Sequence, residues 1–512
     1  MMDFILCFIA FLFALISLKW FQQTKKSTLP LPPGPKGYPI VGNLFQMPTI
    51  TPWKTFKEWS KLHGDVMFLD LPNQPTVVLD SVEAAFELLG KRSDIYSDRP
   101  VSIMQQLAFW DWSPGFLRYS QHWRNHRREL HQFFNQHEVA KYQPIQLREC
   151  RAFLRRALHS PNILDQHVRH IFTAIIMKIT YDMDITEMDS EHVLLAQEAN
   201  LALSIVTMPG VYWVDHFPFL KYLPKWLPGL QFKKIAEYYR PIVEKMRSQP
   251  FDEILQAMRE GRASSSLTSK LIERLQQRSG TTNLSTIDDE LARNVTGVAY
   301  SAAADTTTSA AQSFLIAMSL YPDIQRKAQE ELDRVIGPSR LPEFSDYDDL
   351  VYIQAIALEA LRWMVVLPLS AFHSVTRDDT YRGFLIPKGT TVIANAWAML
   401  HDPKEYPEPT RFEPERYLKD GKLNRAVRNP NTIAFGFGRR ICPGRHLGSA
   451  SLFMTIASIL HTFDIHEILD EDGKPFDPFS SVVTGLISTP DRVPCKLIPR
   501  SDDRKQLIDT SV

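Results

Sequence analysis

The stretch AFGFGRRICPGRHLG, residues 434–448, decides how the rest of the chain is interpreted. Its glycines would let the backbone approach a bulky, flat group closely. Cys442 stands before Pro443, and proline is favoured at the first position of a helix. The apolar run that follows predicts a helix over 444–461. Cys442 would lie at the positive end of this helix, where unpaired N–H groups stabilise a thiolate.

A glycine-rich turn with one cysteine also suits a buried structural cysteine, but the complete pattern F-x-x-G-x-R-x-C-x-G is highly specific. The residues that meet it are Phe435, Gly438, Arg440, Cys442 and Gly444. With this pattern the sequence resembles the cytochrome P450 family. The resemblance implies a haem b whose iron is bound axially by the Cys442 thiolate, the electron-releasing ligand that favours O–O cleavage. It also implies that Phe435, Gly436, Arg440 and Gly444 contact the cofactor, with Arg440 at an anionic group on its rim.

The composition suits one large intracellular domain. The 512 residues include 44% apolar residues, and 58 basic residues balance 58 acidic ones, which argues against a nucleic-acid binder. Four widely spaced cysteines without a CxxC pair do not form a disulfide framework, so we expect a reduced catalytic domain facing the cytosol. We find no internal repeat that would divide the body.

Hydrophobic periodicity predicts helices over most of the body. The predicted helices include 81–90, 121–134, 145–158, 187–207, 232–258, 287–320, 322–336, 347–365 and 444–461. Two strand pairs are predicted as hairpins, 66–70 with 76–80 and 382–386 with 391–396. The expected fold class is mainly α with a small β-rich lobe, a cytochrome P450-type fold whose long central helix crosses the haem.

The expected central helix, 287–320, is rich in small residues near its middle. Small side chains would admit a flat group, although they also suit tight packing between helices. The segment AAADTT (302–307) resembles the family's oxygen-activation motif, with Ala303 where glycine is commonest. The resemblance implies that Ala302 contacts the haem, that Thr306 hydrogen-bonds the oxygen being activated, and that Asp305 helps to relay protons. A polar patch facing another helix is the alternative.

Glu359 and Arg362 are three residues apart on a helix that is apolar on nearly every side. Buried charges must be paired, which disfavours a solvated ion pair here. The two residues resemble the family's E-x-x-R motif, and PERY (414–417) resembles the segment whose arginine, here Arg416, joins the pair. The resemblance implies a structural role on the thiolate side of the haem.

Trp123 and Arg127 are four residues apart on one helical face and resemble the family's pair at a haem propionate. His373 stands where the family often places another propionate-binding residue, although a lone histidine is more often structural. We expect a basic patch that docks an acidic reductase domain, or else ordinary solvated charges. Its members would be Arg124, Arg128, Arg439 and Arg445.

The expected electron donor is a separate NADPH–cytochrome P450 reductase, with cytochrome b5 as a second candidate, because the chain has no nucleotide-binding glycine fingerprint. O₂ and a hydrophobic small molecule are the expected substrates.

The N-terminus predicts membrane attachment. Residues 1–21 contain an uncharged apolar run followed by lysines, which favours a retained signal anchor over a cleaved signal peptide. Residues 22–43 form a proline-rich hinge, and 44–512 form the haem-thiolate domain. The aromatic segment 208–230 is either a loop that dips into the lipid or an ordinary connection. We expect a single-pass protein of the endoplasmic reticulum membrane with a cytosolic catalytic domain.

The predicted function is a monooxygenase that hydroxylates or otherwise oxidises a hydrophobic metabolite. Several phrases, such as SDRP (97–100), are most similar to fungal members used in secondary metabolism. The pocket segments implied by the resemblance (101–118, 365–371 and 483–488) are mostly apolar, which suggests a terpenoid or polyketide. The alternatives are a haem-thiolate desaturase, coupling enzyme or isomerase, and a non-catalytic membrane-anchored helical scaffold.

Overall fold

The computed structural model describes residues 29–188, 190–208, 210–469, 473–474, 476–480 and 482–511. The predicted anchor, residues 1–21, and the first part of the hinge lie outside these residues. Within the described ranges, no helix combines the length and the apolar character needed to cross a bilayer.

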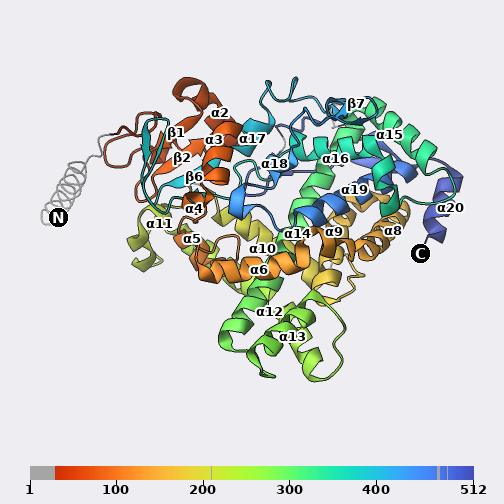
Figure 1. Ribbon diagram of the computed structural model, residues 1–512, viewed down its shortest axis with the longest axis horizontal. Coiled ribbons are helices and arrows are strands. Elements are labelled where there is room, and N and C mark those ends of the chain that lie inside the picture. The colour runs from red at the N-terminus through yellow and green to blue at the C-terminus, as the bar shows by residue number, and fades with distance from the viewer. Residues whose placement is uncertain are drawn as a thin grey trace, which may run out of the picture.

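The described chain is mainly helical with small sheets, which confirms the predicted class (Figure 1). The longer helices are α2 Pro52–His63, α6 Gln121–Phe134, α8 Gln143–His159, α9 Leu164–Tyr181, α10 Glu191–Val206, α12 Gln231–Arg259, α13 Leu267–Ser279, α14 Thr286–Leu320, α15 Pro322–Val335, α16 Val351–Trp363, α19 Arg445–Thr462 and α20 Asp502–Thr510. The shorter ones are α3 Val82–Ala85, α4 Ser93–Tyr96, α5 Ile103–Leu107, α7 Gln136–Ala140, α11 Trp213–His216, α17 Ala396–Leu400 and α18 Asn431–Ala434.

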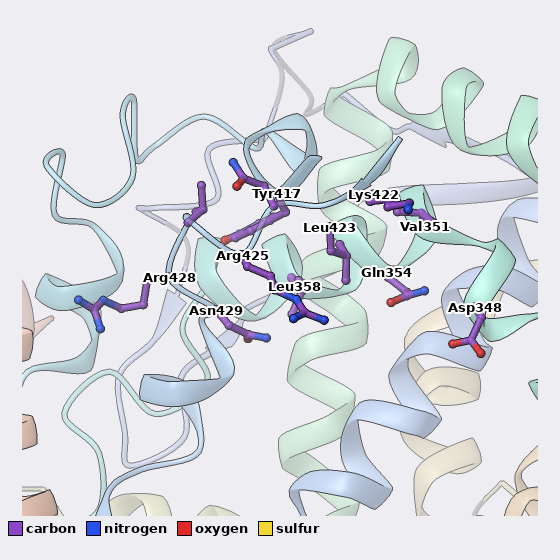
Figure 2. A pocket seen from close by; sticks show the side chains of 12 residues that line it. Asp348, Val351, Gln354, Leu358, Tyr417, Lys422, Leu423, Arg425, Arg428 and Asn429 are labelled. Carbon is purple, nitrogen blue, oxygen red and sulfur yellow. The ribbon is translucent and has the colours of Figure 1, made fainter. Parts of the chain in front are cut away.

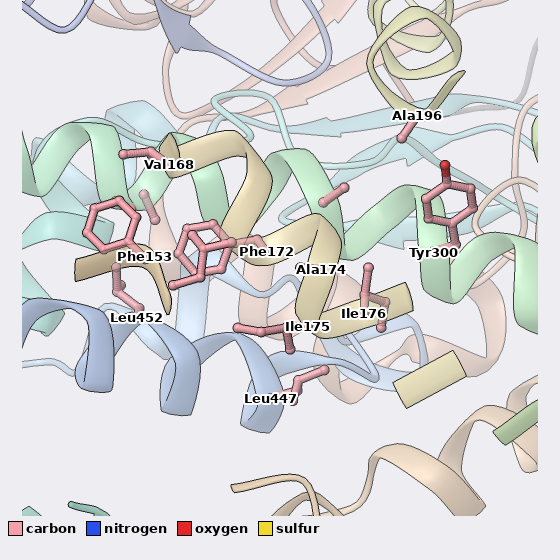
Figure 3. Close-up of a cluster of buried hydrophobic side chains, with 14 of the residues drawn as sticks. Phe153, Val168, Phe172, Ala174, Ile175, Ile176, Ala196, Tyr300, Leu447 and Leu452 are labelled. Carbon is pink, nitrogen blue, oxygen red and sulfur yellow. The ribbon is translucent and has the colours of Figure 1, made fainter. Parts of the chain in front are cut away.

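Helix α14 organises the helical core. Its N-terminus is capped by Ser285, whose Oγ accepts the Asp288 N–H, and it ends before Pro322. At 35 residues it is roughly 50 Å long, and it packs against α9, α12, α16 and α19. Figure 3 shows Phe172 and Ile175 of α9 in the buried cluster that also contains Leu447 of α19. The long central helix predicted from the sequence is therefore confirmed.

The strands of the described residues form one four-stranded sheet and four two-stranded sheets. They are β1 Val66–Leu69, β2 Thr76–Leu79, β3 His373–Ser374, β4 Asp379–Tyr381, β5 Phe384–Ile386, β6 Thr391–Ala394, β7 Leu418–Lys419, β8 Lys422–Leu423, β9 Phe463–Glu467, β10 Val482–Val483, β11 Thr489–Pro490 and β12 Cys495–Pro499. The largest sheet has the order β1-β2-β6-β3, and its β1–β2 hairpin confirms the first predicted strand pair.

The second predicted hairpin is wrong. β5 pairs with β4, whereas β6 runs parallel to β2 and antiparallel to β3. Turn residues between 386 and 391 predict a turn but not the partners of the strands that flank it. All four residues of β6 are buried, and this favours the central position between two strands over a place in a two-stranded hairpin.

The described part of the proline-rich segment packs on these strands. The Pro33 carbonyl accepts a hydrogen bond from the Phe68 N–H at 2.9 Å, and the Pro30 carbonyl accepts one from the Leu385 N–H at 2.8 Å. A Cβ on Gly34 would lie 1.9 Å from the Phe68 carbonyl oxygen, so this position requires glycine. Residues 29–43 thus lie against the strand lobe.

Candidate functional site

The cysteine turn is closed by its own backbone. The Cys442 N–H donates to the Phe435 carbonyl at 2.8 Å, and Gly436 turns the chain with a φ of 77°. Helix α19 begins at Arg445, one residue later than the predicted start at 444, and Pro443 lies before the helix. The Cys442 sulfur still faces the N–H groups of Gly444 and Arg445, which hydrogen-bond to it.

Burial raises the pKa of the Cys442 thiol above its ordinary value, although the N–H groups of Gly444 and Arg445 and the charges of Arg127 and Arg445 act to lower it. The helix N-terminus alone therefore does not produce a thiolate in this protein. A bound metal ion would, because a coordinating thiol loses its proton to the metal.

Gly438 is required by packing within the protein. A Cβ at this position would lie 2.1 Å from the Leu89 carbonyl oxygen, in the segment Phe86–Lys91 that follows α3. The close approach of two backbone segments, and not the expected contact with a flat cofactor, therefore explains why residue 438 is glycine. At Gly444 a Cβ would make an ordinary contact, 3.9 Å from the Cys442 sulfur.

The middle of α14 is accessible although its flanks are buried. Ala302 is exposed and Thr306 is partly exposed, whereas Tyr300 and Phe314 are fully buried. A Cβ on Gly448, in the first turn of α19, would lie 3.8 Å from Thr307 Oγ1. The accessible stretch of α14 and the cysteine turn are therefore neighbours, as the family resemblance implies.

Thr306 and Asp305 lie in an uninterrupted helix. The Thr306 hydroxyl donates to the Ala302 carbonyl at 2.8 Å, so the helical ladder does not open here. Burial raises the pKa of Asp305 to about 6, although the Arg169 charge and a hydrogen bond from Asn200 act to lower it. Asn200 also donates to the Ser301 carbonyl at 2.9 Å. Arg169 and Asn200 belong to other helices, and no motif in the sequence indicated them.

Arg440 lies over Trp123, with its guanidinium carbon 4.2 Å from the ring centroid. It donates to the carbonyls of Ser97, at 2.7 Å, and Leu117, at 2.7 Å. Burial and the neighbouring charges of Arg99 and Arg127 depress the pKa of Arg440 far below its usual value. A buried cation that gains only neutral carbonyls is a ready partner for an anion.

Arg99 is the main site residue that the sequence reasoning missed. It is buried and donates to the carbonyls of Gly115, Ala371 and Phe372. His373 lies close by in β3, where it donates through Nδ1 to the Tyr96 carbonyl at 2.6 Å. Burial and the charges of Arg99 and Arg440 keep the pKa of His373 well below its usual range. The phrase SDRP contains Arg99 and was the available signal.

Arg127 is half-buried near Cys442, and burial lowers its pKa. In the described part of the chain, no carboxylate forms an ion pair with Arg99, Arg127 or Arg440, and nearby Asp98 is engaged by Arg118 and the Tyr119 N–H. Three cations without a counter-ion beside a thiol fit a haem, which carries two carboxylates and needs one protein ligand to its iron. The residues present therefore fit the implied cofactor.

A second group of arginines is paired with a carboxylate of the chain itself. Arg362 forms a bidentate pair with Glu359 at 2.7 and 2.8 Å, and both side chains are completely buried. Arg416 donates to the same carboxylate at 3.2 Å. Arg362 also donates to the Leu400 and Pro409 carbonyls, which joins α16 to the end of α17 and to the segment after it. The three predicted structural residues thus form one network.

Two of the predicted pocket segments meet beside α14. The Ser488 N–H donates to the Val366 carbonyl at 2.8 Å, and Ser309 of α14 donates to the Ser488 carbonyl at 2.7 Å. Segments 365–371 and 483–488 are therefore joined one turn along the helix from Thr306.

The predicted basic patch is only partly assembled. Arg124 and Arg439 are exposed and both lie over the Tyr119 ring, at 4.9 and 5.7 Å from its centroid. Arg128 lies instead by Asn125 and Glu129, and Arg445 donates to the Cys442 carbonyl.

A large cavity of about 880 Å³ lies elsewhere, along the outer face of α16 (Figure 2). Val351 and Leu358 of α16 line one side, and Lys422 and Arg425 belong to the segment on the other side. None of the predicted site residues lines this cavity, so it is not the candidate site.

The comparisons with known proteins agree with this geometry. The cytochrome P450 family model matches residues 32–493. The chain is 42% identical to cytochrome P450 monooxygenase COX1 of Coprinopsis cinerea, over 92% of each chain. It is 41% identical to cytochrome P450 monooxygenase 208 of Postia placenta, over 94% of this chain and 92% of the relative. It is 36% identical to tryptamine 4-monooxygenase of Psilocybe cyanescens, over 92% of this chain and 94% of the relative. With its cysteine turn, central helix and buried Glu359–Arg362 pair, the chain belongs to the cytochrome P450 family and is a P450 monooxygenase.

Proposed function

We propose that the protein binds haem b through Cys442 and oxidises a neutral, hydrophobic metabolite in fungal secondary metabolism. The observation that carries this proposal is the grouping of the Cys442 thiol with buried cations that lack a counter-ion, beside the accessible middle of α14. A haem bound there supplies the reductive activation of O₂. Arg127, Arg440, Arg99 and His373 would hold its carboxylates.

The chain's own contribution to the reaction is proton supply and substrate position. Asp305, with a pKa of about 6, can release and regain a proton near neutral pH. The Thr306 hydroxyl, one residue further along α14, would pass that proton towards the space beside Cys442. Releasing its bond to the Ala302 carbonyl would free the hydroxyl to turn.

The proposed substrate class follows from the lining. Segments 365–371 (VVLPLSA) and 483–488 (VTGLIS) carry no charged side chain. This apolar lining supports a terpenoid or polyketide. Incubation with reductase, candidate metabolites and ¹⁸O₂ tests this class, and mass spectrometry should find one labelled oxygen in a neutral product.

The same experiment addresses the alternatives. A desaturase, coupling enzyme or isomerase of this fold would form product without the label. A non-catalytic scaffold would give a colourless protein, whereas we expect a Soret band that shifts strongly to the red when the reduced protein binds CO.

The redox partner is proposed to be NADPH–cytochrome P450 reductase, with cytochrome b5 as a second donor. Arg124 and Arg439, the exposed part of the basic patch, support docking of an acidic surface on the thiolate side. Electron transfer to the purified protein should slow as salt is raised, because exposed charges are screened.

We also propose attachment to the endoplasmic reticulum membrane. Large apolar side chains are exposed between 213 and 226, with Tyr222 at 79% and Trp226 at 80% exposure, and exposed Phe45 lies edge-on to Trp213. Aromatic rings prefer the lipid interface, which supports lipid contact over an ordinary connection. The full chain should sediment with microsomes after carbonate washing, and its body should be cleaved by protease added outside them.

A further inference from the structure

The segment 108–113, named here the cap loop, borders the candidate site. The residues that follow it are bonded to the cations beside Cys442, because Arg99 donates to the Gly115 carbonyl and Arg440 donates to the Leu117 carbonyl. A movement of the cap loop would therefore act on the backbone that holds Arg99 and Arg440.

The cap loop begins in a strained conformation. Helix α5 ends with the Phe109 N–H bonded to the Gln106 carbonyl and the Trp110 N–H bonded to the Gln105 carbonyl. This is the ending that normally places glycine in the left-handed region, but the residue here is Phe109, with a φ of 62°. A bulky residue in that region is disfavoured by about 1 kcal/mol or more, so contacts elsewhere must hold it.

Cations from α12 lie on the aromatic rings of the loop. Arg247 is 5.7 Å from the Phe109 centroid and 5.4 Å from the Trp112 centroid. Trp112 stacks on Trp110 with centroids 5.6 Å apart. Arg240 also lies over Phe109, at 5.1 Å, but it is exposed.

Arg247 is itself held by a chain of hydrogen bonds with one consistent direction. Its Nε donates to Asn294 Oδ1 at 2.9 Å, and the Asn294 amide donates to His126 Nε2 at 3.2 Å. The His126 Nδ1 donates to the His122 carbonyl at 2.9 Å, which leaves Nε2 free to accept. Asn294 and His126 are completely buried, and burial lowers the pKa of His126 to about 4, which keeps the ring neutral.

We propose that Arg247 is a positioning residue for substrate entry, which clamps the strained cap loop through Phe109 and Trp112 and is anchored by Asn294 and His126. The clamp sets how often the loop opens above the site, and the anchor ties it to α6, the helix that carries Trp123 and Arg127. This inference rests on the proposed haem site, because the loop gates access only if a ligand must reach Cys442-bound iron.

The test measures ligand entry in the haem-loaded full-length protein. Stopped-flow association of 4-phenylimidazole, a bulky iron ligand, should be roughly tenfold faster in Arg247→Met, as expected if about 1.4 kcal/mol of clamp energy is lost. The association rate in Arg247→Lys should lie between the rates of the natural protein and Arg247→Met, because lysine keeps a positive charge over the rings. Arg240→Met is the matched control and should behave like the natural protein, because Arg240 has no bond to Asn294.

A second variant covers the case in which Arg247→Met does not fold. Alanine is favoured over glycine inside a helix, so Gly297→Ala should fold. Its Cβ would lie 3.2 Å from Trp112 Cη2 and 3.3 Å from Arg247 Cγ, and would displace both. Association of 4-phenylimidazole should therefore also be faster in Gly297→Ala than in the natural protein.

Two results would overturn the clamp: unchanged association in Arg247→Met or Gly297→Ala, or an equal increase in Arg240→Met. Failure of the haem proposal would look different, because the unaltered protein would then lack the red-shifted CO band.

Discussion

Two groups of buried arginines lie in the core of this protein, and they differ in what neutralises them. Arg362 and Arg416 share the Glu359 carboxylate. Arg440 and Arg99, by contrast, donate only to carbonyl groups among the described residues. The first group has its counter-ion within the chain and is complete in this sense as the chain folds. The second is complete only with an anion from outside the chain, and this difference separates a structural network from a cofactor site.

The largest effect should come from breaking the complete group. Glu359→Gln leaves two buried cations without their negative partner, which should lower the free energy of unfolding by about 3–5 kcal/mol. Denaturant unfolding of haem-loaded and haem-free protein measures the loss, which should appear in both. Glu405→Gln is the control, since it removes a partly exposed pair with Arg428 and should cost less than about 1 kcal/mol. Equal losses in the two variants would contradict the distinction.

The second group, with the half-buried Arg127 as its third cation, should show the opposite pattern: its loss should affect haem binding and not the stability of the haem-free protein. Arg127→Met removes a cation that would pair with a haem carboxylate, a contact worth about 1.5–3 kcal/mol. We expect haem to be lost roughly 10–100 times faster to a haem-scavenging protein. The haem-free protein should be as stable as before, because Arg127 has no ion-pair partner among the described residues. A destabilised haem-free protein with unchanged haem loss would place Arg127 in the structural class.

Asp305 is a buried charge that belongs to neither group. Its pKa of about 6 in the folded protein exceeds the ordinary value of 3.8, so ionisation opposes folding. The free energy of unfolding therefore falls as the pH rises from 3.8 to about 6. Above about pH 6 the full cost of burying the ionised carboxylate applies. Asp305→Asn should raise the free energy of unfolding by about 1–3 kcal/mol at pH 7, and by nothing below about pH 4.

The activity of Asp305→Asn should move in the opposite direction. Losing a proton relay should reduce the oxidation rate by about 100-fold. Arg169→Met should instead move the pH dependence of stability upward, because Arg169 lowers the pKa of Asp305. A less stable Asp305→Asn protein at pH 7 would show that the carboxylate is satisfied in the folded state.

The smallest effect is expected at the surface. Arg439→Glu should slow electron transfer from the reductase only a few-fold at low salt, since exposed pairs contribute less than about 1 kcal/mol. Arg128→Glu is the comparison, because Arg128 lies by Asn125 and Glu129, whereas Arg124 and Arg439 lie over the Tyr119 ring. Equal effects of the two substitutions would mean that docking is not centred on Arg124 and Arg439.

Local patterns predicted some of these features. Glu359 and Arg362 were found because charges three residues apart on an apolar helix must be buried together. The whole cysteine turn was found because its residues are contiguous. The same holds for the β1–β2 hairpin, whose turn joins strands that pair with each other.

Contacts between distant segments were not predictable in this way. Arg99 lies far in sequence from Arg440 and His373, and although it stands in the phrase SDRP, that phrase does not show which distant residues Arg99 will join. One partner of β6, the strand β2, lies more than 300 residues earlier, so the turn before β6 could not reveal this pairing. Gly438 likewise owes its identity to Leu89.

The protonation state of Cys442 in the haem-free protein was not predictable from the sequence either. The position before a helix was recognised, but the extent of burial was not, and burial decides the direction of the pKa shift of Cys442.

The central claim is that Cys442 binds the haem iron, and the CO complex of the reduced protein tests it most directly. Cys442→Ser nearly preserves the volume of the side chain and leaves Arg127 and Arg440 in place. We predict that the natural protein shows a strongly red-shifted Soret band with CO, and that the serine variant loses this shift even where haem remains bound. A serine variant that keeps the full red shift would contradict the account.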